Sequence, residues 1–270
     1  MSAALIVLGA GGRMGRRIIA LASAGDGTSV VAAIEVAGSP LLGRDAGDLA
    51  GIGPIGVAVT DDFEAAASTA AVALDFTAPE AAVEHARVAA RTRTAIVIGT
   101  TGFSQEQREE IERLAAQTPI LLAANMSVGV NVMLGLVREA VRRLGPSFDI
   151  EIVEVHHNRK KDAPSGTALA LAAAAAQAAG VDPDDALTLA RQGLAGPRRA
   201  GEIGLAALRG GDNVGEHTVM LLGTGERLEL VHRASSRDCL AAGAVRAGQW
   251  LAGHRPGLYS MEDVLGLSTR

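Results

Sequence analysis

Cysteine and aromatic residues are scarce in this sequence. Its 270 residues include one cysteine, one tryptophan, one tyrosine and four phenylalanines. Cys239 can form no disulfide within the chain, so we expect a reducing, cytoplasmic environment. Basic residues are also in the minority, because 25 lysines and arginines against 30 acids leave a net charge of −5. A nucleic-acid partner would require a basic surface, so we expect none.

Long hydrophobic runs are absent too. The run Ala3–Leu8 leads into glycines instead of a signal-peptide cleavage site, and the alanine-rich run 168–179 is too short to span a bilayer. We therefore expect no membrane association. Apolar residues still make up 48% of the chain and charged residues 20%, which predicts a buried core in one large or two modest domains.

Short apolar segments alternate with helical patterns through the first half of the chain. The expected strands are 5–8, 30–34, 72–77, 95–100 and 120–124, and the expected helices are 14–24, 79–91 and 104–117. Ser104 and Gln107 have the spacing of a capping box at the start of the last of these helices. The alternation predicts an α/β fold with a Rossmann-like, doubly wound parallel sheet.

The pattern changes in the second half. A helix at 130–143 and a strand at 149–155 precede an alanine-rich helix, and three β-rich segments follow at 202–209, 215–222 and 226–233. Thr224-Gly225 has the composition of a hairpin turn between the last two. Successive strands without intervening helices predict a smaller α+β domain with a mixed sheet, and the tail returns to a helix at 240–251.

A glycine-rich turn joins the first strand to the next helix. Gly9, Gly12 and Gly15 follow the spacing G-x-x-G-x-x-G, because Met14 replaces the last glycine of the regular dinucleotide motif. Glycines let the backbone approach a pyrophosphate at a helix N-terminus, and Glu35 at the end of the second strand can accept hydrogen bonds from ribose hydroxyls. The pattern predicts a dinucleotide site, with an ordinary tight turn as the alternative.

Two later strand ends fit the same site. Gly99–Gly102 and Ala123–Met126 both follow buried strands, where ligands of doubly wound folds bind. Their small and hydroxyl side chains would let a nicotinamide ring lie close to the backbone. Ordinary turn residues are the alternative for each segment taken alone.

The segment from His156 to Thr167 is the most informative. Two histidines and three basic residues lie within six positions, an arrangement that favours neutral histidine and suits an anionic ligand. A histidine beside a lysine can donate a proton near neutral pH. Ser165 is an expected N-cap, which leaves the N–H groups of Gly166 and Thr167 for a carboxylate or phosphate. A solvated basic loop is the alternative, and no further ligands complete a metal site.

Together these segments resemble the dihydrodipicolinate reductase (4-hydroxy-tetrahydrodipicolinate reductase) family of bacterial lysine biosynthesis. The resemblance extends over nearly the whole chain. It is most specific at 156–168, which reads His-His-x-x-Lys-x-Asp-Ala-Pro-Ser-Gly-Thr-Ala. The match there begins at Glu154, and the other matching segments are 9–15, 75–77, 99–103, Asn125 with 127–131, 209–212, 215–217 and 232–237.

The resemblance implies an NAD(P)H-dependent reduction of 4-hydroxy-2,3,4,5-tetrahydrodipicolinate to tetrahydrodipicolinate in the diaminopimelate route. It makes His156 the proton donor and Lys160 its partner, and it brings Arg237 near the site. The residues that it assigns to the substrate carboxylates are His157, Gly166 and Thr167. The residues that it assigns to the cofactor are Gly9, Ala10, Gly11, Gly12, Arg13, Met14, Glu35, Gly99, Thr100, Thr101, Ala123, Ala124, Asn125 and Met126.

The resemblance also implies how the chain is organised. Residues 1–127 with 236–270 would form the dinucleotide-binding domain, and residues 128–235 would form the substrate-binding and tetramerisation domain. The expected assembly is a homotetramer built from the sheets of the substrate domains.

The sequence departs from its relatives at three positions near the cofactor. Val36 stands where many relatives carry an arginine that meets the 2′-phosphate of NADPH, and Glu35 would repel that phosphate. Ala78 replaces an arginine of some relatives, and Met126 replaces a common phenylalanine. We therefore expect NADH to be preferred, while Arg13, Arg16 and Arg17 leave NADPH possible.

Two other functions stay open at this stage. The chain could be another two-domain NAD(P) oxidoreductase acting on a different carboxylate, which would not require the segment 156–167. It could also be a non-catalytic dinucleotide sensor, which would not require a proton donor.

Overall fold

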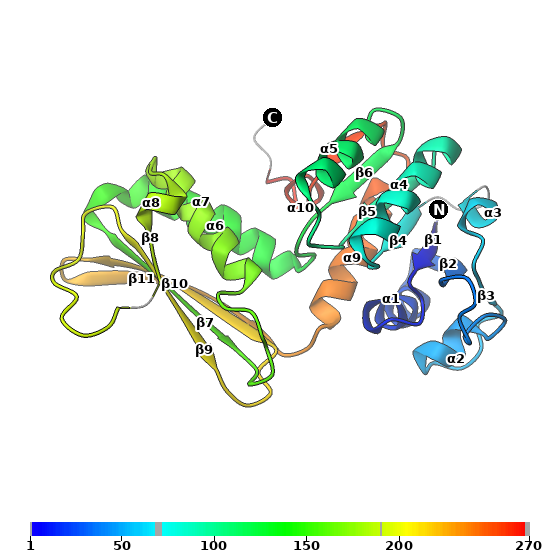
Figure 1. Ribbon diagram of the computed structural model, residues 1–270, viewed down its shortest axis with the longest axis horizontal. Helices are drawn as coiled ribbons and strands as arrows, with labels where there is room; N and C mark the ends of the chain where they lie inside the picture. Colours follow the sequence, from blue (N-terminus) through cyan, green and yellow to red (C-terminus); the bar gives the residue numbers. More distant parts are fainter. Residues whose placement is uncertain (1, 68–71, 190, 268–270) are drawn as a thin grey trace. The chain divides into compact units, whose positions relative to one another are not determined.

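The computed structural model describes residues 2–67, 72–189 and 191–267. The chain divides into two compact units (Figure 1). Unit 1 contains residues 1–128 and 238–270, and unit 2 contains residues 129–237. Each unit has its own sheet and its own hydrophobic core.

Unit 1 is built on a seven-stranded sheet in the order β12-β6-β5-β4-β1-β2-β3, and each of its strand pairs is parallel. The strands are β1 (Ala3–Leu8), β2 (Thr28–Ile34), β3 (Val59–Thr60), β4 (Val72–Asp75), β5 (Ala95–Ile98), β6 (Pro119–Leu122) and β12 (Gly257–Tyr259). The Rossmann-like parallel sheet expected from the sequence is thereby confirmed.

Helices cover both faces of this sheet. They are α1 (Arg13–Ala24), α2 (Ala46–Ala50), α3 (Phe63–Ala67), α4 (Pro79–Thr92), α5 (Gln105–Leu114), α9 (Asp238–Leu251) and α10 (Met261–Val264). The capping box of Ser104 and Gln107 at the start of α5 is confirmed. None of the helices in the described ranges combines the length and hydropathy that a membrane span requires.

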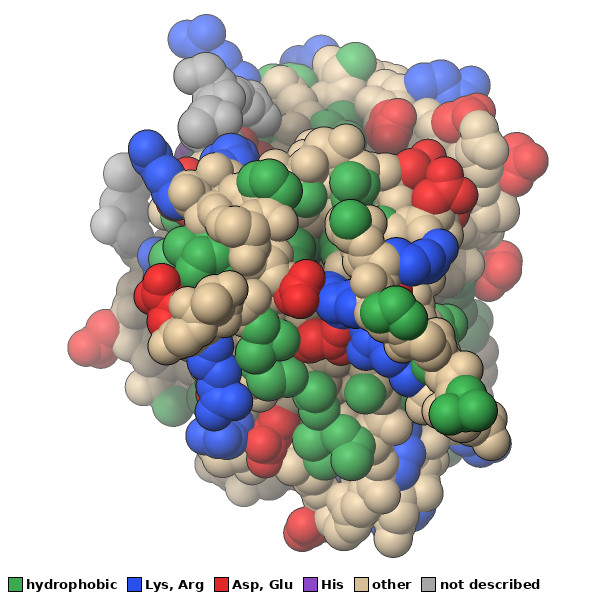
Figure 2. Space-filling view, turned by 90° about the vertical axis from the view of Figure 1, so that its left-hand side faces the viewer, with side chains coloured by type: hydrophobic (Ala, Val, Ile, Leu, Met, Phe, Trp, Pro, Cys, Tyr) green, Lys and Arg blue, Asp and Glu red, His purple; other side chains and the backbone are tan. Residues whose placement is uncertain are grey.

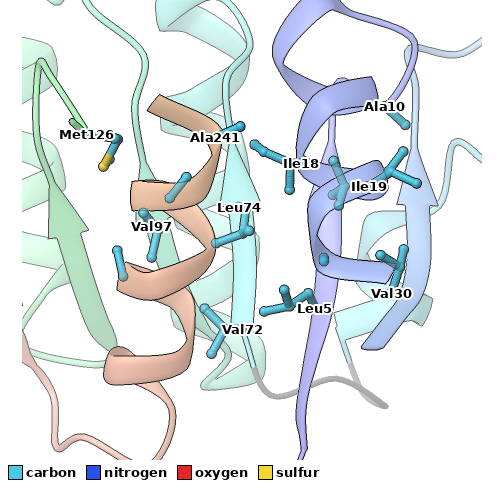
Figure 3. Packing of buried hydrophobic residues seen from close by; sticks show 14 of the residues in the cluster. Leu5, Ala10, Ile18, Ile19, Val30, Val72, Leu74, Val97, Met126 and Ala241 are labelled. Carbon is cyan, nitrogen blue, oxygen red and sulfur yellow. The ribbon is translucent and has the colours of Figure 1, made fainter. Parts of the chain in front are cut away.

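Side chains along β1 point alternately to the two faces of the sheet, and both faces are buried, which explains why the sequence of β1 is continuously apolar. Leu5 and Val7 belong to the core cluster under α1 and α9, whereas Ile6 and Leu8 belong to the cluster under α4 and α5. Figure 3 shows α1 and α9 side by side over the sheet. Burial of each leucine or isoleucine side chain contributes about 1.5–3 kcal/mol, so both layers stabilise the strand that carries the glycine turn.

The C-terminal helix α9 approaches the end of β6 very closely. A Cβ atom on Gly243 would lie 1.8 Å from the carbonyl oxygen of Met126. Only glycine fits this contact, which ties the segment after β6 to the helix. Residues 257–259 then add the edge strand β12 beside β6, a strand that the sequence analysis did not predict.

Unit 2 contains a mixed sheet in the order β11-β10-β7-β9-β8. Its strands are β7 (Asp149–His156), β8 (Leu187–Leu189), β9 (Ile203–Arg209), β10 (Gly215–Gly223) and β11 (Glu226–Ala234), and its helices are α6 (Val128–Leu144), the 3₁₀ turn η1 (Gly145–Ser147), α7 (Gly166–Ala179) and α8 (Pro183–Ala186). Strand β9 runs parallel to β7 and β8, while β10 is antiparallel to β7 and β11. The expected mixed sheet is confirmed, as is the connection of β10 to β11 through Thr224-Gly225.

The strands of unit 2 alternate in burial. Ile150 and Ile152 of β7 are buried, and they belong to one core cluster with Leu171 and Ala175 of α7. Glu154 and His156 follow them at the same two-residue spacing, so they lie on the helix-covered face of the sheet. This register brings polar side chains of β7 to the N-terminal end of α7.

Candidate active site

The glycine turn of unit 1 lies between β1 and α1. Gly9 has a φ of +75°, and a Cβ on Gly15 would lie 2.2 Å from the carbonyl oxygen of Gly9. Gly12 is the N-cap of α1 and has no side chain to bond the first turn, which also lacks acidic residues. The amides at this helix N-terminus are therefore available to an anion, as the sequence predicts.

Glu35 contacts this turn directly. Its Oε1 accepts a hydrogen bond from the Gly11 amide at 2.7 Å. A Cβ on Gly11 would lie 3.0 Å from the same oxygen and 2.2 Å from Cδ1 of Leu41. The structure thus brings Glu35 and the glycine turn together, although they are 24 residues apart in the chain.

A cleft of about 810 Å³ opens beside the turn within unit 1. Its lining includes Gly9, Gly12, Glu35, Val36, Asp61, Asp62, Glu64, Thr77, Ala78, Glu84, His85 and Arg91. Arg91 is paired with Glu64 at 3.1 Å, so the carboxylates of this wall outnumber its basic groups. The volume and the glycine-lined end fit part of a dinucleotide, and the charge disfavours an additional phosphate.

Asp75 organises the loops at the carboxyl ends of β4 and β5. It is fully buried, and its Oδ1 accepts hydrogen bonds from the amide of Thr77 at 2.9 Å and from the hydroxyls of Thr77 and Thr100 at 2.7 and 3.3 Å. Its Oδ2 lies 2.6 Å from Nδ1 of His85. These bonds bend the chain out of the sheet, so β4 and β5 end two residues earlier than expected.

Two further cofactor candidates, Ala123 and Asn125, follow β6 at the same edge of the sheet, whereas the side chain of Met126 is buried in the core cluster under α1 and α9. The amide of Ala123 donates a hydrogen bond to the carbonyl of Ile98 at 3.1 Å, which holds Ala123 beside the end of β5. Asn125 Oδ1 accepts a hydrogen bond from the Ser127 amide at 2.8 Å.

Two of the arginines near the glycine turn have hydrogen-bonding partners. Arg16 Nε donates to the Gly11 carbonyl at 2.9 Å, and Arg17 donates to Asp238 at 2.5 and 2.6 Å. Arg17 is therefore engaged within unit 1.

In unit 2, the candidate proton donor contacts a buried acid. Nδ1 of His156 hydrogen-bonds to Oε2 of Glu154, whose side chain is fully buried. Arg209 donates to both oxygens of Glu154 at 2.9 Å, and the amide of Ser165 donates to Oε1 at 3.0 Å. Burial raises the pKa of Glu154, but the bonds from Arg209, His156 and Ser165 outweigh it and lower that pKa. The carboxylate is therefore charged at neutral pH.

Ser165 is the N-cap of α7, as expected. Its hydroxyl accepts a hydrogen bond from the Ala168 amide at 3.2 Å and lies 3.1 Å from Nε2 of His217. A Cβ on Gly166, the first residue of the helix, would meet open space. A ligand can therefore approach the amides at this helix N-terminus without a steric barrier from position 166.

Lys160 and His157 of the basic loop differ in their surroundings. Lys160 Nζ contacts Asp162 at 2.8 Å, with 20% of the lysine side chain exposed. The pKa of His157 is lowered by burial and by the positive charges of Arg237, Arg159, His156 and Lys160. Neutral His157 agrees with the expected effect of crowded positive charge, and Arg237 is near enough to His157 to exert it.

Across residues 2–67, 72–189 and 191–267, no group of three or more His, Cys, Asp or Glu side chains is arranged to hold a metal ion.

Sequence reasoning missed Glu154, Arg209, Asp75 and His217 as parts of the sites. One signal was available: Glu154 is an acid at a position where the period of β7 predicts a buried residue, two residues before His156. Asp75 similarly ends a strand that is buried along its whole length. The positions of Arg209 and His217 depend on sheet register, which the sequence does not reveal.

The pH dependence of stability should report on His217. Burial and the charge of His156 lower its pKa from 6.5 to about 4. Between pH 6.5 and about pH 4 the unfolded chain binds a proton at His217 that the folded chain excludes. Acidification from about pH 7 to about pH 4.5 should therefore lower the free energy of unfolding by about 2–3 kcal/mol through this group. Urea unfolding at about pH 7 and about pH 4.5, at one chain concentration, should show a smaller loss for His217→Gln than for wild type. His254→Gln is the matched control and should lose as much stability on acidification as wild type does. An equal loss in His217→Gln and wild type would contradict the lowered pKa of His217.

Family models match both parts of the chain. The model described as "Dihydrodipicolinate reductase, N-terminus" matches residues 3–126, and the model described as "Dihydrodipicolinate reductase, C-terminus" matches residues 129–265.

Relatives and one solved structure agree with these matches. The chain is 52% identical over 263 residues to the 4-hydroxy-tetrahydrodipicolinate reductase of Anaeromyxobacter dehalogenans (strain 2CP-C), covering 97% of each chain. It is 51% identical over 266 residues to that of Brucella abortus (strain 2308), covering 98% of this chain and 99% of the relative. The dipicolinate-bound dihydrodipicolinate reductase from Paenisporosarcina sp. TG-14 has a similar fold, with a TM-score of 0.78, 23% identity, and coverage of 96% of this chain and 98% of that one.

Proposed function

Because this chain belongs to the dihydrodipicolinate reductase family, we propose a division of labour in which unit 1 binds NADH and unit 2 binds the substrate and protonates it. The reaction is the NAD(P)H-dependent reduction of 4-hydroxy-2,3,4,5-tetrahydrodipicolinate to tetrahydrodipicolinate, in the diaminopimelate route of lysine biosynthesis. The observation that carries the assignment is the contact of His156 with buried Glu154 beside the N-terminus of α7. It supplies a proton donor and an anion-binding helix end within one segment.

His156 is the proposed proton donor. Its Nδ1 is bonded to Glu154, so Nε2 is the nitrogen that faces away from this acid. A bound nicotinamide supplies the hydride, and the nitrogen of the reduced substrate then requires a proton. Transfer from His156 Nε2 meets that requirement, and the ammonium of Lys160 stabilises the developing negative charge.

The substrate carboxylates are proposed to bind at the N-terminus of α7. The amides of Gly166 and Thr167 lie in its first turn, where the helix dipole favours anions. Neutral His157 adds a hydrogen-bonding group without requiring a charge to be desolvated. This arrangement suits a dicarboxylate.

Substitutions at Gly166 test this carboxylate site. Proline is well tolerated at the first helical position, and the extended conformation of Ser165 is compatible with it, so Gly166→Pro removes an amide hydrogen with little strain. We expect KM for the substrate to rise about tenfold, because one charge-assisted hydrogen bond is lost. Gly166→Ala keeps the amide and fits the open space, so it is the matched control.

Thr167→Val completes the comparison, because it also keeps the backbone amide. It should raise KM less than Gly166→Pro does. The opposite order, or equal KM values for the proline and alanine variants, would count against the carboxylate site.

The cofactor is proposed to bind at the glycine turn and in the adjacent cleft. The residues proposed to hold it are Gly9, Ala10, Gly11, Gly12, Arg13, Met14, Glu35, Gly99, Thr100, Thr101, Ala123, Ala124, Asn125 and Met126. NAD(P)H binding belongs to the family, and the acidic wall of the cleft supports a preference for NADH. A 2′-phosphate near Glu35 would meet repulsion, while a free 2′-hydroxyl could donate to that carboxylate.

Val36→Arg tests the origin of this preference. Val36 lines the cleft and is 72% exposed, so the longer side chain can be accommodated. We expect kcat/KM with NADPH to rise about tenfold, because a guanidinium pairs with the 2′-phosphate, and kcat/KM with NADH to change little. Val36→Gln adds length without charge and should leave NADPH use near the wild-type level. Equal gains in the two variants would contradict an electrostatic cause.

A homotetramer assembled through unit 2 is the proposed oligomeric state. On the sheet face opposite α6 and α7, Leu208 and Val231 are 49% and 43% exposed. The ion pair between Arg233 and Glu216 lies on the same face. Figure 2 shows hydrophobic side chains interspersed with both charges on the visible face of the molecule. A mixture of exposed apolar side chains and paired charges suits a contact with another copy of the chain.

The cytoplasm is the proposed location. The chain has a single cysteine, Cys239, which can form no disulfide within the chain, and the reaction consumes a reduced nicotinamide cofactor. Both features suit a reducing compartment.

A further inference from the structure

We propose that Glu154, held by Arg209, is a positioning residue that fixes the tautomer of His156 and makes Nε2 the nitrogen that delivers the proton. Gly215 keeps that nitrogen accessible. The inference rests on the proposed function, in which His156 is the proton donor. It adds a buried acid–arginine pair that determines how the histidine works.

Glu154 has no freedom to reorient. Its fully buried carboxylate accepts four hydrogen bonds: one from His156, one from the Ser165 amide and two from Arg209. A carboxylate offers about four acceptor positions, so this set exhausts its capacity. The carboxylate is therefore a fixed acceptor for Nδ1 of His156.

Arg209 holds Glu154 from the neighbouring strand. It is paired with His156 in the register of β7 and β9. Its guanidinium also donates to the carbonyls of Leu208 at 2.6 Å and Asp162 at 2.8 Å. Because these bonds fix the guanidinium to two backbone segments, Glu154 is restrained together with the loop that carries Lys160. A buried carboxylate with this partner is compensated in charge as well as in hydrogen bonding.

A charged carboxylate beside Nδ1 dictates where the proton of neutral histidine lies. Glu154 accepts and cannot donate, so Nδ1 must carry the hydrogen. Imidazolium can then lose its other proton, from Nε2, without breaking the bond to Glu154. The protein keeps the same geometry before and after proton transfer, which reduces reorganisation during the reaction.

The space around Nε2 supports this assignment. A Cβ on Gly215 would lie 2.9 Å from Nε2 of His156, so any larger residue would displace the imidazole or cover the nitrogen. On another side, the ring of His217 packs edge-on against His156 with centroids 5.3 Å apart. The ring is thereby confined by a neighbour while Gly215 leaves its reactive nitrogen uncovered.

Glu154 also connects the proton donor to the proposed carboxylate site. Its Oε1 accepts from the amide of Ser165, the N-cap of α7. One buried carboxylate thus sets both the orientation of His156 and the start of the helix that carries Gly166. A change at Glu154 should therefore affect kcat strongly and KM moderately.

Nitrogen NMR of the ¹⁵N-labelled, full-length protein tests the tautomer without substrate. His156 resonances are assigned by their absence in His156→Gln. In wild type, neutral His156 should carry its hydrogen on Nδ1. A neutral ring with the hydrogen on Nε2 would overturn the proposal, and this readout does not depend on whether His156 is the catalytic donor.

Glu154→Gln should shift neutral His156 toward a mixture of tautomers and lower kcat by roughly tenfold or more, because an amide can accept or donate. Glu139→Gln makes the same change at a surface glutamate of α6 that pairs with Arg142 and Arg143, and it should leave both readouts at wild-type values. An unchanged tautomer and kcat in Glu154→Gln would overturn the proposal.

Gly215→Ala provides a test that leaves the acid–arginine pair intact if Glu154→Gln does not fold. Gly215 has a φ of +157°, so alanine is strained there, and an unchanged Nδ1-protonated tautomer shows that the site still folds. In the folded variant kcat should fall by roughly tenfold, because the new methyl group crowds Nε2. Wild-type kcat in this variant would overturn the role of Nε2. Undiminished turnover in His156→Gln would instead refute the proposed proton donor, so the two failures are distinguishable.

Discussion

His156→Gln should lower kcat by about a hundredfold to ten-thousandfold, the range that a positioned proton donor contributes. Glutamine can still hydrogen-bond to Glu154, but it has no proton to transfer near neutral pH. KM for the substrate should change by no more than about threefold, because the proposed carboxylate contacts lie at Gly166 and Thr167. Steady-state NADH oxidation with freshly generated substrate measures both constants.

The control for this prediction is His254→Gln. His254 lies in unit 1, where its ring stacks on Trp250 at a centroid distance of 3.9 Å, and it belongs to neither proposed site. We expect wild-type kcat from this variant. Wild-type kcat from His156→Gln would remove His156 from the chemistry, whereas a large rise in KM alone would make it a binding residue.

Lys160→Ala should impair both substrate binding and turnover. Its ammonium is the proposed partner of His156 at a site proposed for an anionic substrate, so its loss should raise KM and lower kcat, with kcat/KM reduced about a hundredfold. The change also leaves the carboxylate of Asp162, 2.8 Å from Nζ in the native protein, without its cation. The pKa of Asp162 is lowered mainly by the hydrogen bond from Lys160, and even without this bond the group stays charged near pH 7 and would repel the substrate.

Lys161→Ala provides the matched control for Lys160→Ala. It removes the same charge from the next residue, which is exposed and has no assigned role. We expect it to retain most of the wild-type kcat/KM. Similar losses in the two variants would indicate general attraction by the basic loop instead of a specific role for Lys160.

Much of the fold is encoded in local patterns of this sequence. The five buried strands of the first half, the glycine turn and the capping box of α5 all follow from residue spacing, and each is present. Strand β12 was missed because three residues are too few to show a period, and its position depends on the edge offered by Pro119–Leu121. Strands β4 and β5 were predicted too long, because Thr77 and Thr100 bond to Asp75 instead of continuing the sheet.

The candidate site was predictable only where its residues are consecutive in the sequence. The segment from His156 to Thr167 concentrates its chemistry in consecutive residues, so the sequence alone indicates a donor and an anion site. Arg209 reaches Glu154 across 55 residues, and His217 reaches Ser165 across 52. Such contacts arise from strand register, and no local spacing encodes them. The hydrogen-bonding partners of the proposed catalytic groups could therefore be identified only from the structure.

The most direct test of the account is a coupled assay of the unmodified protein. Dihydrodipicolinate synthase supplies its fresh product, and oxidation of NADH and of NADPH is followed separately. We predict rapid oxidation that depends on the synthase product, with a higher kcat/KM for NADH than for NADPH. Failure to oxidise either cofactor with this substrate, or equal turnover with unrelated keto acids and imines, would contradict the account.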